Sequence, residues 1–224
     1  TNIADLAIQG VATANLSAID SRDFAVLSAA AVSRLSSAQV QNLSTDQLRA
    51  LTSANIVSLD MRGLTTAKLA VIDDVDFAGF NSAAIAGLST ALVSGLSTAQ
   101  LVALTTTNIK GLNLDGVSSA NVSVIETQDL GGLSTSQIAS FSAANVVGLT
   151  TAQLSSLDTA NSSALGTSGL VYLSTAAVEG LLPAQVQNLS ATQAGYLTSA
   201  QLTALSTTNI ADLAIQGVAT ANLS

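Results

Sequence analysis

The sequence predicts an all-α fold, a solenoid or superhelix of very short capped helices, on three observations. First, an eight-residue phrase recurs through most of the chain and is clearest between Leu35 and Leu59, as LSSAQVQN, LSTDQLRA and LTSANIVS. Second, each phrase carries the signals of a helix start. Third, one continuous helix is excluded, because the apolar stripe would drift by about 80° per octad at 100° per residue.

The octad LSTDQLRA shows these helix-start signals most clearly. Ser44 is a favourable N-cap residue, and Gln47 three residues later completes a capping box, in which each side chain accepts from the other residue's backbone N–H. Leu43 and Leu48 occupy the two positions that form a hydrophobic staple. Pro183, the only proline, falls at the first helical position of its octad, where a missing N–H costs nothing.

Glycine at the last octad position predicts how the helices end. Helices commonly finish on a residue with left-handed backbone, for which glycine is favoured. We therefore expect a left-handed residue at Gly79, Gly87, Gly95, Gly111, Gly132, Gly148 and Gly180. Helices this short are unstable alone, so neighbouring coils of a solenoid must bury the Leu/Val seam.

Five-residue units interrupt the octads and reset their register. The units LDMRG, LNLDG and LAIQG occupy residues 59–63, 112–116 and 213–217. The first two resets lie 53 residues apart, which predicts a superhelical turn or corner of that length. Glycine closes each unit, and also an earlier one at Gly10, which predicts a tighter or reversed turn.

A β fold is the alternative. The stretch ADLAIQGVATANL, present near both ends, has a period of five and looks like a pentapeptide-repeat β-solenoid, with Leu6, Val11 and Leu16 as its central residues. The resemblance covers only a few units, because octads follow.

Residues 1–224 form a single continuous repeat array, without a linker or a break in composition. Residues 1–17 recur identically at 208–224, a shift of 207 residues that corresponds to 24 octads and three pentads. The identity predicts that the chain is a window of a longer tandem array of 207-residue blocks.

Composition restricts the function. The sequence has no histidine and no cysteine, which removes most nucleophile–base pairs and transition-metal sites, so we predict no enzyme and no cofactor. The net charge of −8 argues against nucleic acid as a partner. Ser and Thr interrupt every apolar run, so no membrane span is predicted.

The acidic octads are the one place where a metal site is conceivable. Asp73, Asp74 and Asp76 are weak candidates for calcium, although the spacing of known calcium loops is absent. The alternative, which we favour, is that Asp20, Asp73 and Glu126 cap helix N-termini in place of serine.

The phrases LSTAQL, LTTAQL and LTSAQL, at residues 96, 149 and 197, resemble the long Ser/Thr/Ala/Gln-rich repeat proteins of proteobacteria. That resemblance implies an exported surface, adhesin-like or filament-forming protein, located outside the cell or on its surface. Two functions are therefore expected. The first is a structural protein that associates with itself and forms or decorates an extracellular filament or surface layer. The alternative is the stalk of a bacterial adhesin.

The exposed polar side chains predicted for these repeats could hydrogen-bond sugars or neighbouring copies. The chain is only 3% aromatic, and no aromatic platform for stacking a sugar is expected. Self-association is therefore the favoured interaction.

Overall fold

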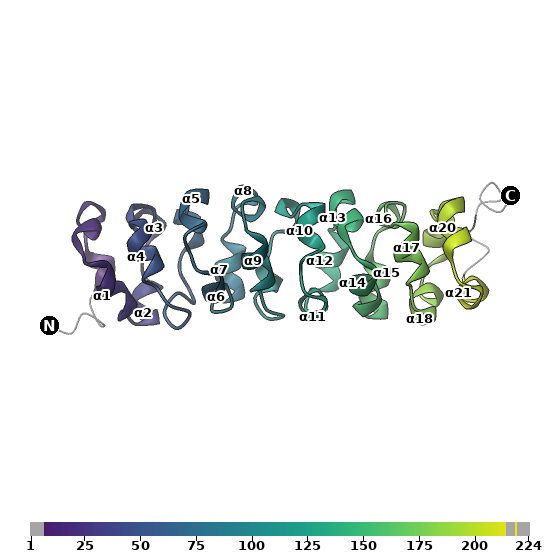
Figure 1. Ribbon diagram of the computed structural model, residues 1–224, viewed down its shortest axis with the longest axis horizontal. Coiled ribbons are helices and arrows are strands. Elements are labelled where there is room, and N and C mark those ends of the chain that lie inside the picture. Colours follow the sequence, from purple (N-terminus) through teal and green to yellow (C-terminus); the bar gives the residue numbers. More distant parts are fainter. Residues whose placement is uncertain (1–6, 214–217, 219–224) are drawn as a thin grey trace. The chain divides into compact units, whose positions relative to one another are not determined.

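The computed structural model describes residues 7–213 and 218. Short helices of three to six residues occupy most of the stretch from Ile8 to Asp212. Figure 1 shows these helices coloured along the sequence. The chain divides into two units, Thr1–Gly116 and Val117–Ser224. None of the described residues lies in a strand, so the all-α prediction is confirmed and the β-solenoid alternative is wrong for them. No helix among them is both long enough and apolar enough to cross a membrane.

The first unit contains α-helices and 3-10 helices (η). They are η2 (Ile8–Gly10), η3 (Thr13–Ala18), α1 (Ser21–Ala25), α2 (Ala29–Val32), α3 (Ser37–Asn42), α4 (Thr45–Arg49), η4 (Met61–Gly63), α5 (Thr66–Leu69), α6 (Asp74–Phe77), α7 (Ser82–Ala86), α8 (Thr90–Ser94), α9 (Thr98–Val102), η5 (Ile109–Gly111) and η6 (Leu114–Gly116).

The second unit contains α-helices only, within its described residues. They are α10 (Ser119–Val122), α11 (Thr127–Leu130), α12 (Thr135–Ala139), α13 (Ala143–Gly148), α14 (Thr151–Ser156), α15 (Thr159–Ala164), α16 (Thr167–Leu170), α17 (Thr175–Glu179), α18 (Pro183–Gln187), α19 (Ala191–Gly195), α20 (Ser199–Ala204) and α21 (Thr207–Asp212).

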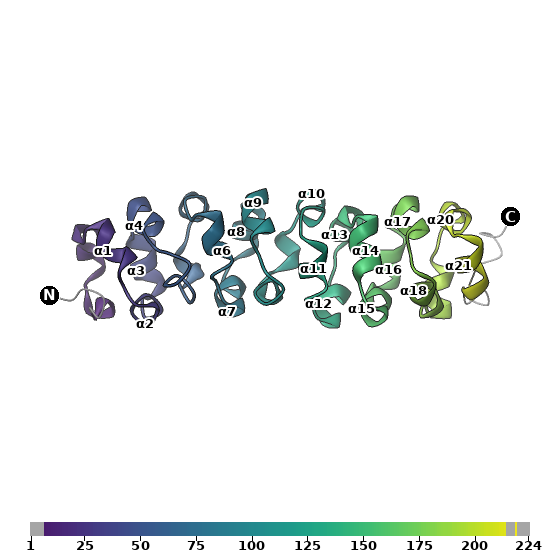
Figure 2. The same cartoon turned by 60° about the horizontal axis from the view of Figure 1, so that its bottom comes forward.

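Three octads make one coil of the solenoid. In the second unit each helix packs on the helix three octads later, which gives three columns: α10, α13, α16 and α19; α11, α14, α17 and α20; and α12, α15, α18 and α21. Figure 2 shows α12, α15 and α18 of the third column along the lower edge of this unit. A full coil is therefore 24 residues, as from Thr135 in α12 to Thr159 in α15, which is less than half of the 53 residues between the first two resets.

The apolar residues of each octad line the interior of the coils. Leu43 and Leu48, the predicted staple, are buried, and the same two octad positions supply most of the core. The capping box of Ser44 and Gln47 is present, and Pro183 occupies the first turn of α18 as predicted. Because the chain forms a new short helix or turn in each octad, the apolar seam faces inward despite the mismatch between eight residues and the helical period.

The left-handed backbone predicted at the octad-ending glycines is absent from the described residues. No glycine of the described residues has a positive φ, and the helices ending at Gly87 and Gly180 keep right-handed backbone. Close packing between coils explains several of these glycines instead. A Cβ at Gly111 would overlap the carbonyl oxygen of Ser82, and one at Gly148 would overlap that of Ser119, one coil earlier in each case.

The pentads replace octads as one side of a coil. The 3-10 helix η4 packs on α3, and η6 packs on α8, at the places where full octads stack elsewhere in this unit. A tight 3-10 turn therefore closes these pentads, and no reversed backbone occurs at Gly10, Gly63 or Gly116. Gly217 lies outside the described residues. Each pentad shortens its side by three residues.

Gly148→Ala is expected to destabilise the protein by about 1–3 kcal/mol, because the new methyl group overlaps the Ser119 carbonyl in the preceding coil. Gly131→Ala is the matched control, because its Cβ would lie 3.4 Å from the Gln128 carbonyl, an ordinary contact. Alanine favours helix over glycine, so the control should be neutral or stabilising by up to ~1 kcal/mol. Chemical unfolding of both variants tests this, and equal losses would contradict the packing explanation.

Candidate functional site

Buried amide side chains connect successive coils. The Gln47 Oε1 accepts from the backbone N–H of Ser44 at 2.9 Å, which completes the capping box of α4. The Nε2 of the same side chain donates to the carbonyls of Leu16 and Ile19, both at 2.8 Å, at the end of η3. The Leu16 carbonyl also accepts from the Ile19 N–H at 3.1 Å, so Gln47 is its second donor. This one side chain thus hydrogen-bonds to the start of its own helix and to the end of a helix in another coil.

The same arrangement recurs along both units, and we call it the amide ladder. Its members are glutamine or asparagine at the fifth octad position, and each donates to backbone carbonyls 28 to 31 residues earlier. They are Gln39, Gln47, Asn55, Gln100 and Asn108 in the first unit, and Asn145, Gln153, Asn161, Gln185, Gln193, Gln201 and Asn209 in the second. All of them are buried. An amide suits this position because it offers both a donor and an acceptor.

The two octads that follow the first pentad carry a charged residue at the ladder position. Lys68 occupies the ladder position of octad 64–71, and its ammonium donates to the Gln41 carbonyl of the preceding coil. Burial lowers the pKa of Lys68. Asp76 occupies the ladder position of octad 72–79, and its buried carboxylate accepts from the backbone N–H of Ser53. A carboxylate cannot donate to carbonyls, so the hydrogen bond between coils is reversed at Asp76.

The three calcium candidates do not form a cluster. Asp76 is buried and faces the preceding coil, whereas Asp73 and Asp74 are exposed. Burial raises the pKa of Asp76, and repulsion from the nearby Asp73 carboxylate adds to this effect. Among the described residues, no three His, Cys, Asp or Glu side chains are grouped so that they could hold a metal ion.

The acidic capping residues are confirmed in part. Asp20 accepts from the backbone N–H of Arg22 at 2.9 Å and caps α1 as predicted. Asp73 and Glu126 occupy the N-cap positions of α6 and α11, but their side chains form no capping hydrogen bond. The predicted caps at these two residues are therefore wrong, although the predicted helix starts are right.

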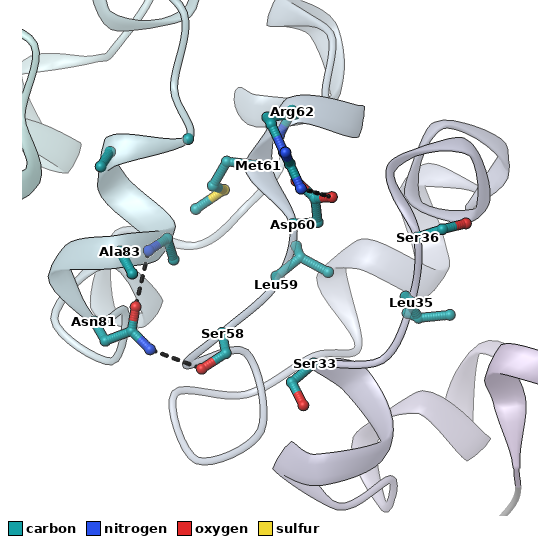
Figure 3. Close-up of a pocket in the computed structure, with 13 residues that line it drawn as sticks. Ser33, Leu35, Ser36, Ser58, Leu59, Asp60, Met61, Arg62, Asn81 and Ala83 are labelled. Atoms are coloured by element: carbon teal, nitrogen blue, oxygen red, sulfur yellow. Dashed lines mark hydrogen bonds and ion pairs between the residues drawn. The ribbon is translucent and has the colours of Figure 1, made fainter.

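A surface hollow of about 630 Å³ lies over the first pentad, between segments 33–36, 58–62 and 81–87 of the first unit. Sequence reasoning missed it, although the signal was present: a pentad three residues shorter than its neighbouring octads leaves that side of its coil incomplete. Figure 3 shows the pentad residues Asp60 and Arg62 at the hollow, with Ser58 and Asn81 opposite.

The polar groups of this hollow mainly bind one another. The Arg62 Nε lies 2.8 Å from the Asp60 Oδ1, and the Asn81 Nδ2 lies 2.7 Å from the Ser58 hydroxyl. The hydrogen bond from Arg62 lowers the pKa of Asp60, against the opposing effect of burial. The charged residues of the hollow, Asp60 and Arg62, are thus paired with each other.

Comparison with known proteins identifies the repeat. The family model described as the ALTTAQ repeat matches residues 16–53, 69–106 and 122–159, which together cover just over half of the chain. Each match lies between pentads and excludes residues 59–63 and 112–116. The resemblance seen in the LTTAQ-type phrases is therefore confirmed at the level of the repeat.

Other comparisons add little. No curated protein matches the chain. Among solved structures, the chain is similar to the leucine-rich repeat-containing protein LegL7 from Legionella pneumophila, at 14% identity, with 88% of this chain and 77% of that chain covered. The TM-score is 0.22, too low to support an argument about fold or function.

Gln47→Leu is expected to destabilise the protein by about 2–3 kcal/mol, because the Leu16 and Ile19 carbonyls lose their shared donor and the Ser44 N–H loses its acceptor. Gln41→Leu is the matched control, since Gln41 is an exposed glutamine of the preceding octad. Urea unfolding monitored by circular dichroism compares the two. Similar stabilities of both variants would show that the ladder contributes little.

Asp76→Asn is expected to stabilise the protein near neutral pH by about 1 kcal/mol, because the amide avoids placing a charge in a buried position. The pKa of Asp76 in the folded state is raised. The ionised carboxylate therefore lowers the free energy of unfolding of the wild type by its full amount at pH values above that raised pKa. The penalty, and with it the advantage of the variant, disappears as the pH falls through the raised pKa and below the ordinary 3.8.

Thermal unfolding near neutral pH and at about pH 3 measures this difference. The contribution of Asp60, whose lowered pKa has the opposite sign, is common to both proteins and cancels. A variant that is less stable than the wild type near neutral pH would show that the Ser53 hydrogen bond requires the charged carboxylate.

Proposed function

Because the chain belongs to the ALTTAQ repeat family, we propose that it is a structural protein that self-assembles into, or decorates, an extracellular filament or surface layer. The amide ladder is the observation that carries this proposal. Every ladder side chain satisfies the backbone of the preceding coil, so a coil is complete only when another coil follows it. A solenoid of this kind can be lengthened by adding coils without a new type of contact.

The distribution of polar groups supports a structural role over a catalytic one. The sequence contains no histidine or cysteine, and its commonest buried polar side chains are amides, which do not titrate. The contacts that the ladder amides make to the preceding coil are hydrogen bonds to backbone carbonyls, an arrangement that fixes the position of coils. The extracellular placement rests on the resemblance to exported Ser/Thr/Ala/Gln-rich repeat proteins.

Electron microscopy of the purified protein at increasing concentration, with far-ultraviolet circular dichroism of the same samples, tests the proposal. Regular fibres or sheets with a helical spectrum are the expected result. Dispersed particles at every concentration, again with a helical spectrum, would reject self-assembly and favour the adhesin stalk. The Gln47→Leu variant is a useful comparison, because weakened coils should give fewer or shorter assemblies if stacked coils carry the assembly.

A further inference from the structure

The two tyrosines of the chain occupy the same octad position in neighbouring coils of the second unit. Tyr172 ends octad 165–172 and Tyr196 ends octad 189–196, one coil of 24 residues apart. Their side chains are 49% and 51% exposed, and the helices α16 and α19 that precede them pack on each other. This side of the unit therefore exposes two aromatic residues, which composition alone did not lead us to expect.

Exposed aliphatic residues extend the same surface. Val147 lies one coil before Val171, and the two side chains are 56% and 37% exposed. All four residues lie at the last two octad positions in the column formed by α10, α13, α16 and α19. We call this set, Val147, Val171, Tyr172 and Tyr196, the tyrosine face.

The other two columns of the unit differ at the same octad positions. There the last two residues of the octads are small, polar or charged, namely Gly131, Gly132, Ser155, Ser156, Glu179, Gly180, Thr203 and Ala204 in one column and Ala139, Ser140, Ser163, Ala164, Gln187, Asn188, Ala211 and Asp212 in the other. Large exposed apolar side chains at this position are thus confined to one column.

Charge separates the columns in the same way. The octads of the tyrosine face, 117–124, 141–148, 165–172 and 189–196, contain no Asp, Glu, Lys or Arg. The other two columns carry all the charges of residues 117–213, and every one is acidic: Glu126, Asp129, Asp158, Glu179 and Asp212. In a chain of net charge −8, contact between copies through those columns would place like charges together, whereas the tyrosine face avoids this repulsion.

We propose that the tyrosine face is a self-association surface, on which a second copy of this chain packs with its own tyrosine face. Tyrosine suits such a contact, because its ring buries apolar area while its hydroxyl keeps a hydrogen-bond partner. A twofold arrangement brings identical patches together, and the absence of charge makes the patch self-complementary. The inference rests on the proposed self-assembly and names the surface that performs it.

Sedimentation velocity of the full chain over a wide concentration range tests the inference. The wild type should associate, and Tyr172→Ser/Tyr196→Ser should raise the dissociation constant at least about tenfold. Leu182→Ser is the matched control, since Leu182 is 48% exposed but lies in a different column, and it should leave association unchanged. Val147→Glu is a second test, because it introduces a negative charge on both copies and should also weaken association.

Circular dichroism establishes that the variants remain folded, as expected for exposed positions. If the wild type, the tyrosine double variant and Val147→Glu all associate with the same dissociation constant, the inference is wrong. If fibres still form in both variants, the proposed structural function stands and only the assigned surface is wrong. If the wild type stays monomeric and binds an insoluble polysaccharide, and the tyrosine double variant does not bind it, the inference is also wrong. The tyrosine face would then be a carbohydrate-binding surface.

Discussion

The hydrogen bond from a buried amide to the carbonyls of the preceding coil is the interaction on which the fold depends. Helices of four to six residues leave most of their backbone groups without a partner inside the helix, and burying such groups without any partner is costly. One amide side chain at the fifth octad position supplies hydrogen-bond partners to a helix start and to a helix end. As Gln47 shows, it caps its own helix and pairs carbonyls at the end of η3 in the preceding coil. Very short helices can therefore form a solenoid without strands.

The departures from the octad mark the positions where the solenoid changes. A pentad closes with a 3-10 turn and shortens one side of its coil, which opens the hollow beside Asp60 and Arg62. The ladder changes in the two octads that follow. There the Lys68 ammonium donates to the Gln41 carbonyl, and the Asp76 carboxylate accepts from the Ser53 backbone N–H. These two contacts span 27 and 23 residues (76 − 53), whereas the ladder amides reach carbonyls 28 to 31 residues earlier.

The outer surface separates into sides of different chemistry even though the inner seam is uniform. The second unit carries acidic residues on two of its helix columns and the tyrosine face on the third. Coil length produces this separation, because residues that recur every 24 positions lie in the same column. A surface stripe can thus be varied in sequence without altering the buried positions that hold the coils together.

The sequence by itself determined the local structure, because the signals are contained within single octads: Ser44 with Gln47 as the capping box, Leu43 with Leu48 as the staple, and Pro183 at a helix start. Only the tertiary structure decided which octads stack. It assigned Gln47 a second set of partners 28 and 31 residues away, explained Gly148 by the approach of Ser119, and brought Tyr172 and Tyr196 to one surface. These features depend on the number of octads per coil, which capping and staple signals within one octad do not encode.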